Sequence, residues 1–194
     1  MWNCDEMGGM RKYLAFITTL FAASVTYGYV YALLNPSDAA AVIQELDIAF
    51  DWIKDLSPLT IMLLIFLNNA AKSLVAIVFG VVIAIPIGFI AFNGYILGII
   101  FCEYARTSGP AYVAAAILPH GVIELPMVLL SAALGTRIGF AVLLRMIGKI
   151  STEEILSEMK RSVSFYFRWI LPLLFVAAVI ETFVTPLLLW LMGW

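Results

Sequence analysis

Long apolar runs, one of them with no charged side chain over residues 73–102, most constrain how this chain can fold. Such a run is long enough for a helix to cross the hydrocarbon core of a bilayer. The runs are continuous rather than alternating, which favours helices over barrel strands, because a helix satisfies its own backbone hydrogen bonds. Of the 194 residues, 63% are hydrophobic and 12% are charged. The sequence therefore predicts an all-α, polytopic integral membrane helix bundle.

Five transmembrane spans are expected, forming a single membrane domain over residues 1–194. Polar segments separate most of them, and the long apolar stretch from Leu59 to Arg106 has length for two spans, with Pro86 and Asn93-Gly94 as candidate breaks. The apolar piece Ile138–Ile147 is too short to span by itself. The spans are placed near residues 13–34, 59–82, 84–104, 112–134 and 169–192.

Two amphipathic interfacial helices are expected between spans. The first has Asn35 as N-cap and Pro36 in its first turn, and runs to about Leu56 with a single apolar stripe. Its acidic face disfavours anionic lipid, so it is expected to cap the bundle or to pack on a second copy, giving a homodimer. The second begins at Ser151 and Glu154, which form a Ser-x-x-Glu capping box, and it runs to Arg168-Trp169.

Basic residues predict the orientation. Arg11 and Lys12 precede the first span, and six basic residues lie between the fourth and fifth spans. Cytoplasmic loops carry an excess of Lys and Arg, so we expect a multi-pass protein of the cell membrane with a cytoplasmic N-terminus. The net charge of −2 gives no basic face for nucleic acid. The expected partners are the lipid bilayer, a second copy and other membrane proteins.

Several polar side chains lie inside the predicted spans, where an ionisable group costs about 2.5–3.5 kcal/mol and usually faces the bundle interior. His120 and Glu124 are four residues apart, so on a helix they share one face. Pro119 and Pro126 flank them and predict a helix broken or kinked near Pro119-His120. Gly121 is expected to allow a close backbone approach. The predicted polar core is formed by Asn68, Asn69, Lys72, Asn93, His120, Glu124 and Glu181.

Three interpretations of this core stay open. The polar groups could simply hold helices together. They could form a proton or ion pathway. They could also bind a divalent metal ion, zinc being the best candidate, with His120, Glu124 and Glu181 as ligands, because imidazole and carboxylates suit zinc. Glu181 is then either a ligand or the counter-charge of Lys72.

The polar residues also carry a resemblance. Asn68-Asn69, Asn93-Gly94 with Gly98, the block Pro119-His120-Gly121-x-x-Glu124-x-Pro126, and Glu181 with Thr185-Pro186 resemble the stage II sporulation protein M family. The likeness covers roughly Leu59 to Leu188, and the proline–histidine block is its most specific part. The resemblance implies a polytopic membrane protein; the bacterial namesake acts with other sporulation proteins in engulfment and cell-wall remodelling. It implies no particular reaction.

Two functional hypotheses follow. The first is a non-enzymatic membrane component, transport-like or part of a membrane assembly, whose intramembrane site binds a divalent metal. The alternative is an intramembrane hydrolase acting on peptide or lipid. A zincin mechanism is excluded because it needs His-Glu-x-x-His and the chain has a single histidine. Ser73, Ser108 and Ser131 are available as nucleophiles, but none lies in a Gly-x-Ser-x-Gly context.

Overall fold

A computed structural model describes residues 4–194 of the chain, with side chains from residue 9 onward. In this part of the chain every regular element is helical and no strand occurs. Five helical segments are long and apolar enough to cross a membrane: Gly9–Leu34, Pro58–Val81, Ala84–Thr107, Pro110–Met146 and Thr152–Leu191. The predicted all-α polytopic bundle with five spans is therefore confirmed, while its unity as a single domain stays a prediction.

The chain begins with α1 (Cys4–Leu34), followed by α2 (Pro36–Phe50) and the 3-10 turn η1 (Asp51–Asp55). The next segments are α3 (Pro58–Val78), the 3-10 turn η2 (Phe79–Val81), α4 (Ala84–Thr107) and α5 (Pro110–Met146). After a turn, the chain ends in a nearly continuous rod made of α6 (Thr152–Phe165), η3 (Tyr166–Ile170), α7 (Leu171–Val179), η4 (Ile180–Val184) and α8 (Thr185–Leu191).

Two predicted boundaries differ from the structure. Residues 138–147 do not form a separate short piece, because α5 continues from Pro110 to Met146. No proline lies after Pro126 in this helix, so the backbone hydrogen bonds continue until Gly148, which adopts a positive φ of 73°. Similarly, the second amphipathic helix does not stop before the last span but passes directly into it.

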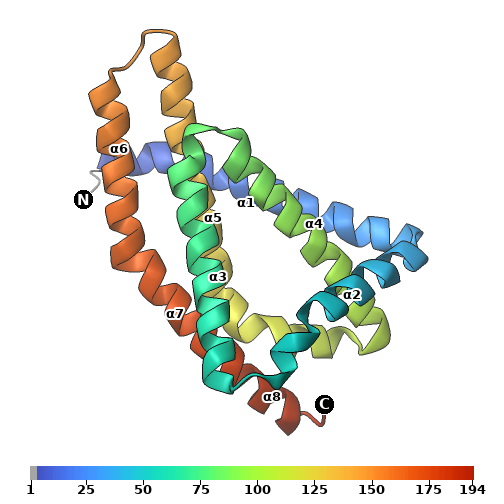
Figure 1. The fold of residues 1–194 in the computed structure, drawn as a ribbon. Helices are drawn as coiled ribbons and strands as arrows, with labels where there is room; N and C mark the ends of the chain where they lie inside the picture. The colour runs from blue at the N-terminus through green and yellow to red at the C-terminus, as the bar shows by residue number, and fades with distance from the viewer. Residues whose placement is uncertain (1–3) are drawn as a thin grey trace.

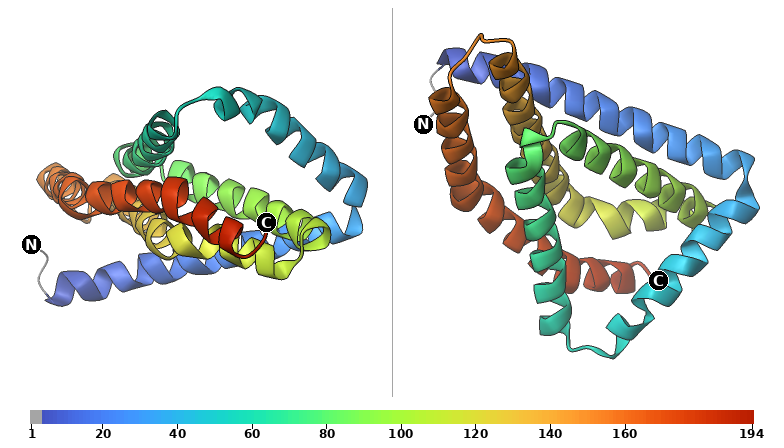
Figure 2. Two further views of the ribbon diagram at one scale, coloured as in Figure 1. Left: turned by 90° about the horizontal axis from the view of Figure 1, so that it is seen from below. Right: turned by 45° about the horizontal axis from the view of Figure 1, so that its top comes forward.

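α1 and α4 lie along each other, and α5 rises beside α3 and turns back into α6 (Figure 1). The N-terminus of α1 and the turn between α5 and α6 lie toward one end of the molecule (Figure 2). The turn between η1 and α3 and the C-terminus lie toward the opposite end.

Glycines bring two pairs of helices into close contact. A methyl group added at Gly98 of α4 would collide with the backbone of Val25 in α1. At the second crossing, a methyl group at Gly135 of α5 would collide with the carbonyl of Ala76 in α3. Small residues let membrane helices approach this closely, and van der Waals packing then supplies much of their association energy. These crossings hold α1 against α4 and α3 against α5.

The acidic helix α2 covers the end of the α1–α4 pair. Its Ala39 is fully buried and packs with Ile99 and Cys102 of α4. Further along, Ala49 and Phe50 are exposed, so the predicted apolar stripe is interrupted there. Asn35 precedes the helix as expected, but its side chain donates to the carbonyl of Tyr31 instead of capping α2. α2 thus caps the bundle, and dimerisation through it stays a prediction.

α6 starts with the predicted capping box. The Ser151 hydroxyl accepts from the Glu154 amide, and the Glu154 carboxylate accepts from the Ser151 amide. Below it, the rod contains two π-helical turns, η3 and η4, each ending just before a Leu-Pro or Thr-Pro pair that includes Pro172 or Pro186. A proline lacks an amide hydrogen and crowds the carbonyl four residues earlier, and a wider turn accommodates both effects.

The prediction of a broken helix near Pro119-His120 is wrong, because α5 is helical throughout and contains both Pro119 and Pro126. The helix instead changes direction along its length: its lower part runs across the molecule and its upper part rises toward the α6 turn (Figure 1). Proline removes one backbone hydrogen bond and kinks a helix without ending it when neighbouring helices hold both sides. The other predicted outcome, a kink, agrees with this shape.

Candidate metal centre

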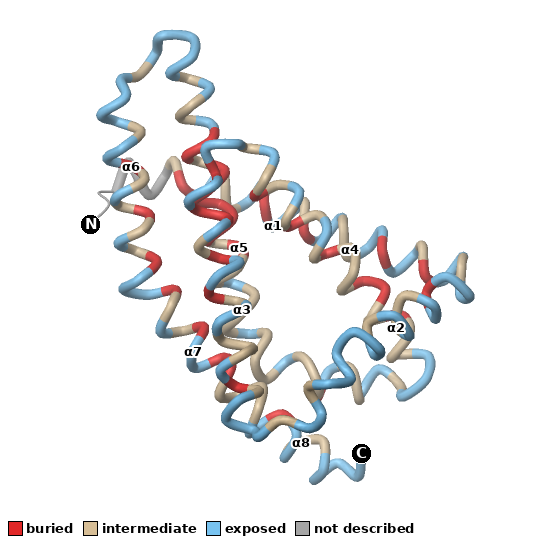
Figure 3. Tube along the Cα trace, viewed as in Figure 1, coloured by how far each residue is buried: buried red, intermediate tan, exposed pale blue. Residues whose placement is uncertain are grey.

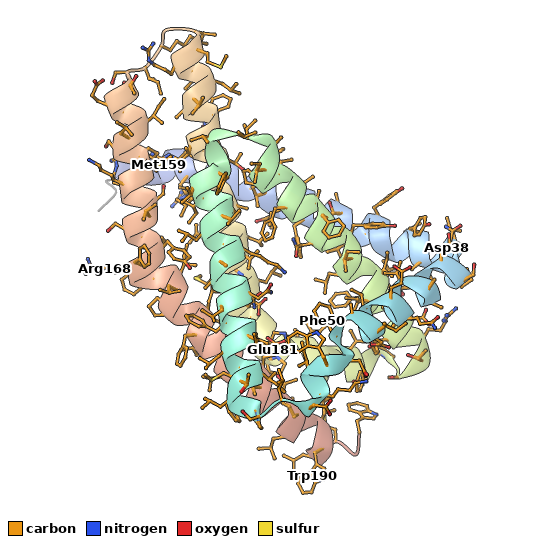
Figure 4. All side chains as sticks on the ribbon, viewed as in Figure 1. Asp38, Phe50, Met159, Arg168, Glu181 and Trp190 are labelled. Carbon is orange, nitrogen blue, oxygen red and sulfur yellow. The ribbon has the colours of Figure 1, made fainter. Side chains whose placement is uncertain are left out.

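The structure brings His120, Glu124 and Glu181 together. His120 and Glu124 project from the same face of α5, as their spacing predicted, and Glu181 comes from η4 in the last span. One ligand atom from each of the three lies within 4.8 Å of the other two. All three side chains are half-buried. Figure 4 labels Glu181 in the lower part of the molecule, where the C-terminal rod passes behind α3.

Polar atoms at this place lack protein partners. His120 Nδ1 is buried and has no hydrogen-bond partner in the described part of the chain. The hydroxyl of Thr182, which follows Glu181 in the sequence, is also buried and has no hydrogen-bond partner among the described residues. A buried polar group without a partner costs about 1–3 kcal/mol, so each such group calls for an explanation. Both atoms belong to the cluster residues or to their neighbour in sequence, and both leave hydrogen-bonding capacity unused.

The π-helical turn explains how Glu181 reaches the cluster. η4 spans Ile180–Val184, and Pro186 follows it after Thr185. Single π turns widen a helix locally and rotate the residues that precede them, and they are frequent at functional sites. The Thr185 hydroxyl donates to the carbonyl of Ile180 at 3.4 Å, a weak bond across the wide turn. Sequence alone predicted Glu181 as a ligand but not the turn that positions it.

The donor set fits a divalent transition metal. One imidazole and two carboxylates from two helical segments are the ligand types of three-residue zinc sites with an open fourth position. Neighbouring ligand atoms around tetrahedral zinc are roughly 3.5 Å apart, so side chains whose ligand atoms lie within 4.8 Å of one another need at most a small closure to bind the ion. Two carboxylates this close repel each other, and a divalent cation between them removes that repulsion.

Lys72 does not pair with Glu181 as one interpretation suggested. No ion pair of Lys72 is found in the described part of the chain. α3, which carries Lys72, packs against both α5 and η4. The Lys72 side chain itself is exposed and is not a member of the cluster.

The asparagines of the predicted polar core are engaged locally. The Asn68 amide donates to the Asn69 side chain at 3.2 Å, within α3. The Asn93 amide donates to the carbonyl of Phe89 at 2.7 Å, within α4. None of these bonds reaches His120 or either glutamate. The membership of these asparagines in a common core thus stays a prediction.

No arrangement for nucleophilic hydrolysis joins His120 to a serine among the described side chains. The Ser131 hydroxyl donates to the carbonyl of Met127, within its own helix. Ser73 is fully buried in α3 without a hydrogen-bond partner. Ser108 lies exposed after the end of α4. The hydrolase alternative gains no support from these positions.

A second polar cluster was missed by sequence reasoning. Arg137 of α5 and Glu158 of α6 form an ion pair of 3.0 Å with side chains only 15% and 8% exposed, and Arg161 lies 3.7 Å from the same carboxylate. In the sequence, these basic residues predict only the orientation of the chain. Glu158, Ser162 and Tyr166 recur every four residues and are all buried, a periodic pattern that could have identified the inward face of α6.

Comparison with known proteins adds the following. Residues 17–186 match the family described as Stage II sporulation protein M. An uncharacterized protein of Methanocaldococcus jannaschii is 32% identical over 100 residues, which are 49% of this chain and 53% of that protein. The match thus spans about half the length of that curated relative. No solved structure matches the chain.

Proposed function

This chain belongs to the stage II sporulation protein M family of membrane proteins, and on that premise we propose that it binds a divalent metal ion, zinc being the best candidate, inside the membrane. The protein acts without catalysis, as a transport-like component through which the ion enters or crosses the bilayer. The observation that carries the proposal is the cluster of His120, Glu124 and Glu181, with ligand atoms within 4.8 Å.

Three features support a cation over simple packing. The cluster contains two carboxylates, and a bundle gains little from placing two like charges together unless a cation or proton separates them. His120 Nδ1 has no protein partner, although packing polar groups in membranes usually satisfy each other. The site is also flanked by a proline bend in α5 and a π turn in the last span, and irregular helices near mid-membrane are typical of ion sites in transporters.

The test is elemental analysis of the purified full-length protein, followed by zinc titration. We expect about one zinc per chain in the wild type and loss of binding in His120→Ala and Glu124→Gln. Asn93→Ala is the matched control, because Asn93 is an intramembrane polar residue whose bond stays within its own helix. Wild-type protein without stoichiometric zinc, or mutants that bind it normally, would contradict the proposal.

Transport is tested separately in liposomes. We expect wild-type protein to carry zinc across the bilayer and Glu181→Gln to lose that flux while staying folded. If zinc binds and stabilises the protein but no flux occurs, the site is structural. If the three substitutions lower only thermal stability, with neither binding nor flux in the wild type, the polar cluster merely holds the helices together.

The proposal includes an orientation. Arg11 and Lys12 lie near the start of α1, and this end of the molecule also carries the turn between α5 and α6 (Figure 2). Lys149 lies in that turn. The acidic helix α2 lies toward the opposite end with Asp38 (Figure 4). The N-terminus and the α5–α6 turn are thus cytoplasmic under the positive-inside rule. Labelling of single cysteines at positions 38 and 149 from outside intact cells tests this, and reaction at position 149 alone would reverse the orientation.

A further inference from the structure

An exposed face of the C-terminal rod carries two basic residues that neither the metal centre nor the bundle core uses. Lys160, Ser164 and Arg168 follow one another at intervals of four residues, and all three are exposed. The rod is helical throughout this stretch, where α6 passes into η3. Residues four apart on a helix are neighbours on one face, so Ser164 lies between the two cations. Figure 4 shows Arg168 on the side of the rod that faces away from α3 and α5.

The two cations are not neutralised within the described part of the chain. No ion pair of Lys160 or Arg168 is found there, whereas Arg161, on the inner side, lies 3.7 Å from the buried Glu158 carboxylate. The Arg168 guanidinium carbon lies 6.0 Å from the centre of the Trp169 ring, a contact that leaves its N–H donors available. This face therefore presents two positive charges and a hydroxyl group to whatever covers it.

The sequence around Arg168 places this face at the surface of a bilayer. Arg168 is the last charged residue before Glu181, and residues 169–180 contain no charge. The rod is apolar enough to cross a membrane, so its uncharged part begins directly after Arg168. Trp169 is 51% exposed, and exposed indole rings concentrate at the level of the lipid headgroups. The Arg168 guanidinium is thus at the depth of the headgroup phosphates.

The same face continues into the membrane as an apolar strip. Pro172, Phe175 and Val176 lie four, seven and eight residues after Arg168, and all three are exposed. The face therefore offers positive charge and a hydroxyl at headgroup depth, and hydrocarbon contacts below them. This order of groups matches a phospholipid with a negative headgroup. A free anion or an acidic soluble protein would match only the charged part.

We propose that the face formed by Lys160, Ser164 and Arg168 binds the phosphate of an anionic phospholipid, whose acyl chain lies along the apolar strip. The two cations offset the charge of the headgroup, and the Ser164 hydroxyl donates to a phosphate oxygen between them. A zwitterionic lipid brings its own positive charge next to the phosphate and gains less from the two cations. The site is separate from the metal centre, because Glu181 lies about 20 Å further along the rod.

The test is a titration of full-length protein in detergent with dioctanoyl phosphatidylglycerol and, in parallel, with dioctanoyl phosphatidylcholine, followed by isothermal calorimetry. We expect the wild type to prefer the anionic lipid. Lys160→Gln and Arg168→Gln should each weaken its binding by about fivefold, and by about 30-fold together, because each basic residue near the headgroups contributes separately. Arg168→Lys keeps the charge and should retain most of the preference, which separates loss of charge from loss of folding.

Lys149→Gln is the matched control, because Lys149 is an exposed basic residue of the α5–α6 turn outside this face. Loss of the preference in Lys160→Gln and Arg168→Gln, but not in Lys149→Gln, supports the lipid site. An equal loss in Lys149→Gln overturns it, because the attraction is then a diffuse effect of all basic residues at this end. A wild type that binds both lipids equally also overturns it. Displacement of the anionic lipid by an equal concentration of inorganic phosphate would show a site for free anions instead.

Discussion

The two parts of α5 differ in burial. Most residues from Leu129 to Gly139 are buried, whereas among positions 110–128, all of which the structure describes, Ala115 alone is buried. Figure 3 shows the same contrast along the helix, with buried residues concentrated in its upper part. We call residues 129–146 the anchor half and residues 110–128 the site half. The anchor half meets α3 through glycines and α6 through a buried ion pair. The site half carries two prolines, His120 and Glu124.

The difference teaches that one helix can combine a rigid support with an adjustable site. Close packing and buried ion pairs hold the anchor half in a single position, because any displacement would open cavities or leave a charge unpaired. The site half has fewer buried residues, so its side chains can move toward a bound ion at a low cost in packing energy. Regions that bind ligands are commonly the less stable parts of a fold.

The largest effect is expected from substitution of Gly135, the glycine through which the anchor half contacts α3. In Gly135→Ala the added methyl group collides with the backbone of α3, which cannot move aside. We expect the unfolding free energy to fall by about 4 kcal/mol or more, measured by denaturation in detergent. Gly121→Ala in the site half is the control: its methyl group meets only the flexible Ile117 side chain at 3.4 Å. Equal losses in both variants would contradict the division of α5.

The same glycine comparison corrects a sequence prediction. Gly121 was expected to allow a close backbone approach, but its added methyl group would contact only a side chain of its own helix. The close approaches occur instead at Gly98 and Gly135. Gly121 lies within the proline–histidine block, but a glycine next to polar residues in the sequence does not indicate which backbone packs against it.

Breaking the buried ion pair should have the next largest effect. Glu158→Gln leaves Arg137 in a largely buried position without its carboxylate, and we expect a loss of about 3 kcal/mol in unfolding free energy. The double variant Arg137→Met with Glu158→Met should recover much of this loss, because no unpaired charge is left. Asp51→Asn, which breaks an exposed pair, should have almost no effect. A Glu158→Gln variant as stable as the wild type would show that the pair does not hold the anchor.

Substitution of a proline in the site half is expected to raise the unfolding free energy instead of lowering it. Pro126→Ala restores a backbone hydrogen bond in α5 and should raise the unfolding free energy by about 2 kcal/mol. The helix straightens, so His120 and Glu124 shift relative to Glu181 and zinc binding weakens. Pro110→Ala is the control, because Pro110 is at the start of α5, where its missing amide costs nothing. Higher stability with unchanged zinc affinity would show that the bend does not position the ligands.

The smallest effect is expected at a hydroxyl inside the anchor half. The Thr136 hydroxyl is buried and has no hydrogen-bond partner in the described part of the chain. Thr136→Val should therefore raise the unfolding free energy by about 1 kcal/mol, because a desolvated polar group is replaced by a methyl group. Ser131→Ala should give no such gain, since Ser131 already donates to Met127. Thermal unfolding measures both, and destabilisation by Thr136→Val would reveal a partner for the hydroxyl.

Much of this fold could be predicted because its signals are local. The apolar runs predicted five spans, and Ser151 with Glu154 predicted the start of α6, since both depend on residues close in sequence. The boundary errors have a local cause as well: the apolar piece after Leu134 was separated from the fourth span by a length rule alone. Nothing in residues 127–146 interrupts a helix, and the structure continues it.

The candidate site was predicted in part. The shared face of His120 and Glu124 follows from their spacing on one helix, but the approach of Glu181 depends on how α5 and the last span pack. The pairing of Arg137 with Glu158 could not be predicted for the same reason. Each depends on a contact between segments far apart in the sequence, and no periodic pattern encodes which segments meet.

Sequence alone determined that this chain spans a membrane with helices and that charged groups lie where lipid would exclude them. Both follow from transfer free energies of individual residues and from the need to satisfy the backbone within each span. The tertiary structure decided which of those groups share one place and which half of α5 is held rigidly. Those outcomes depend on helix crossings, which glycine contacts and a buried ion pair fix only when the whole bundle has formed.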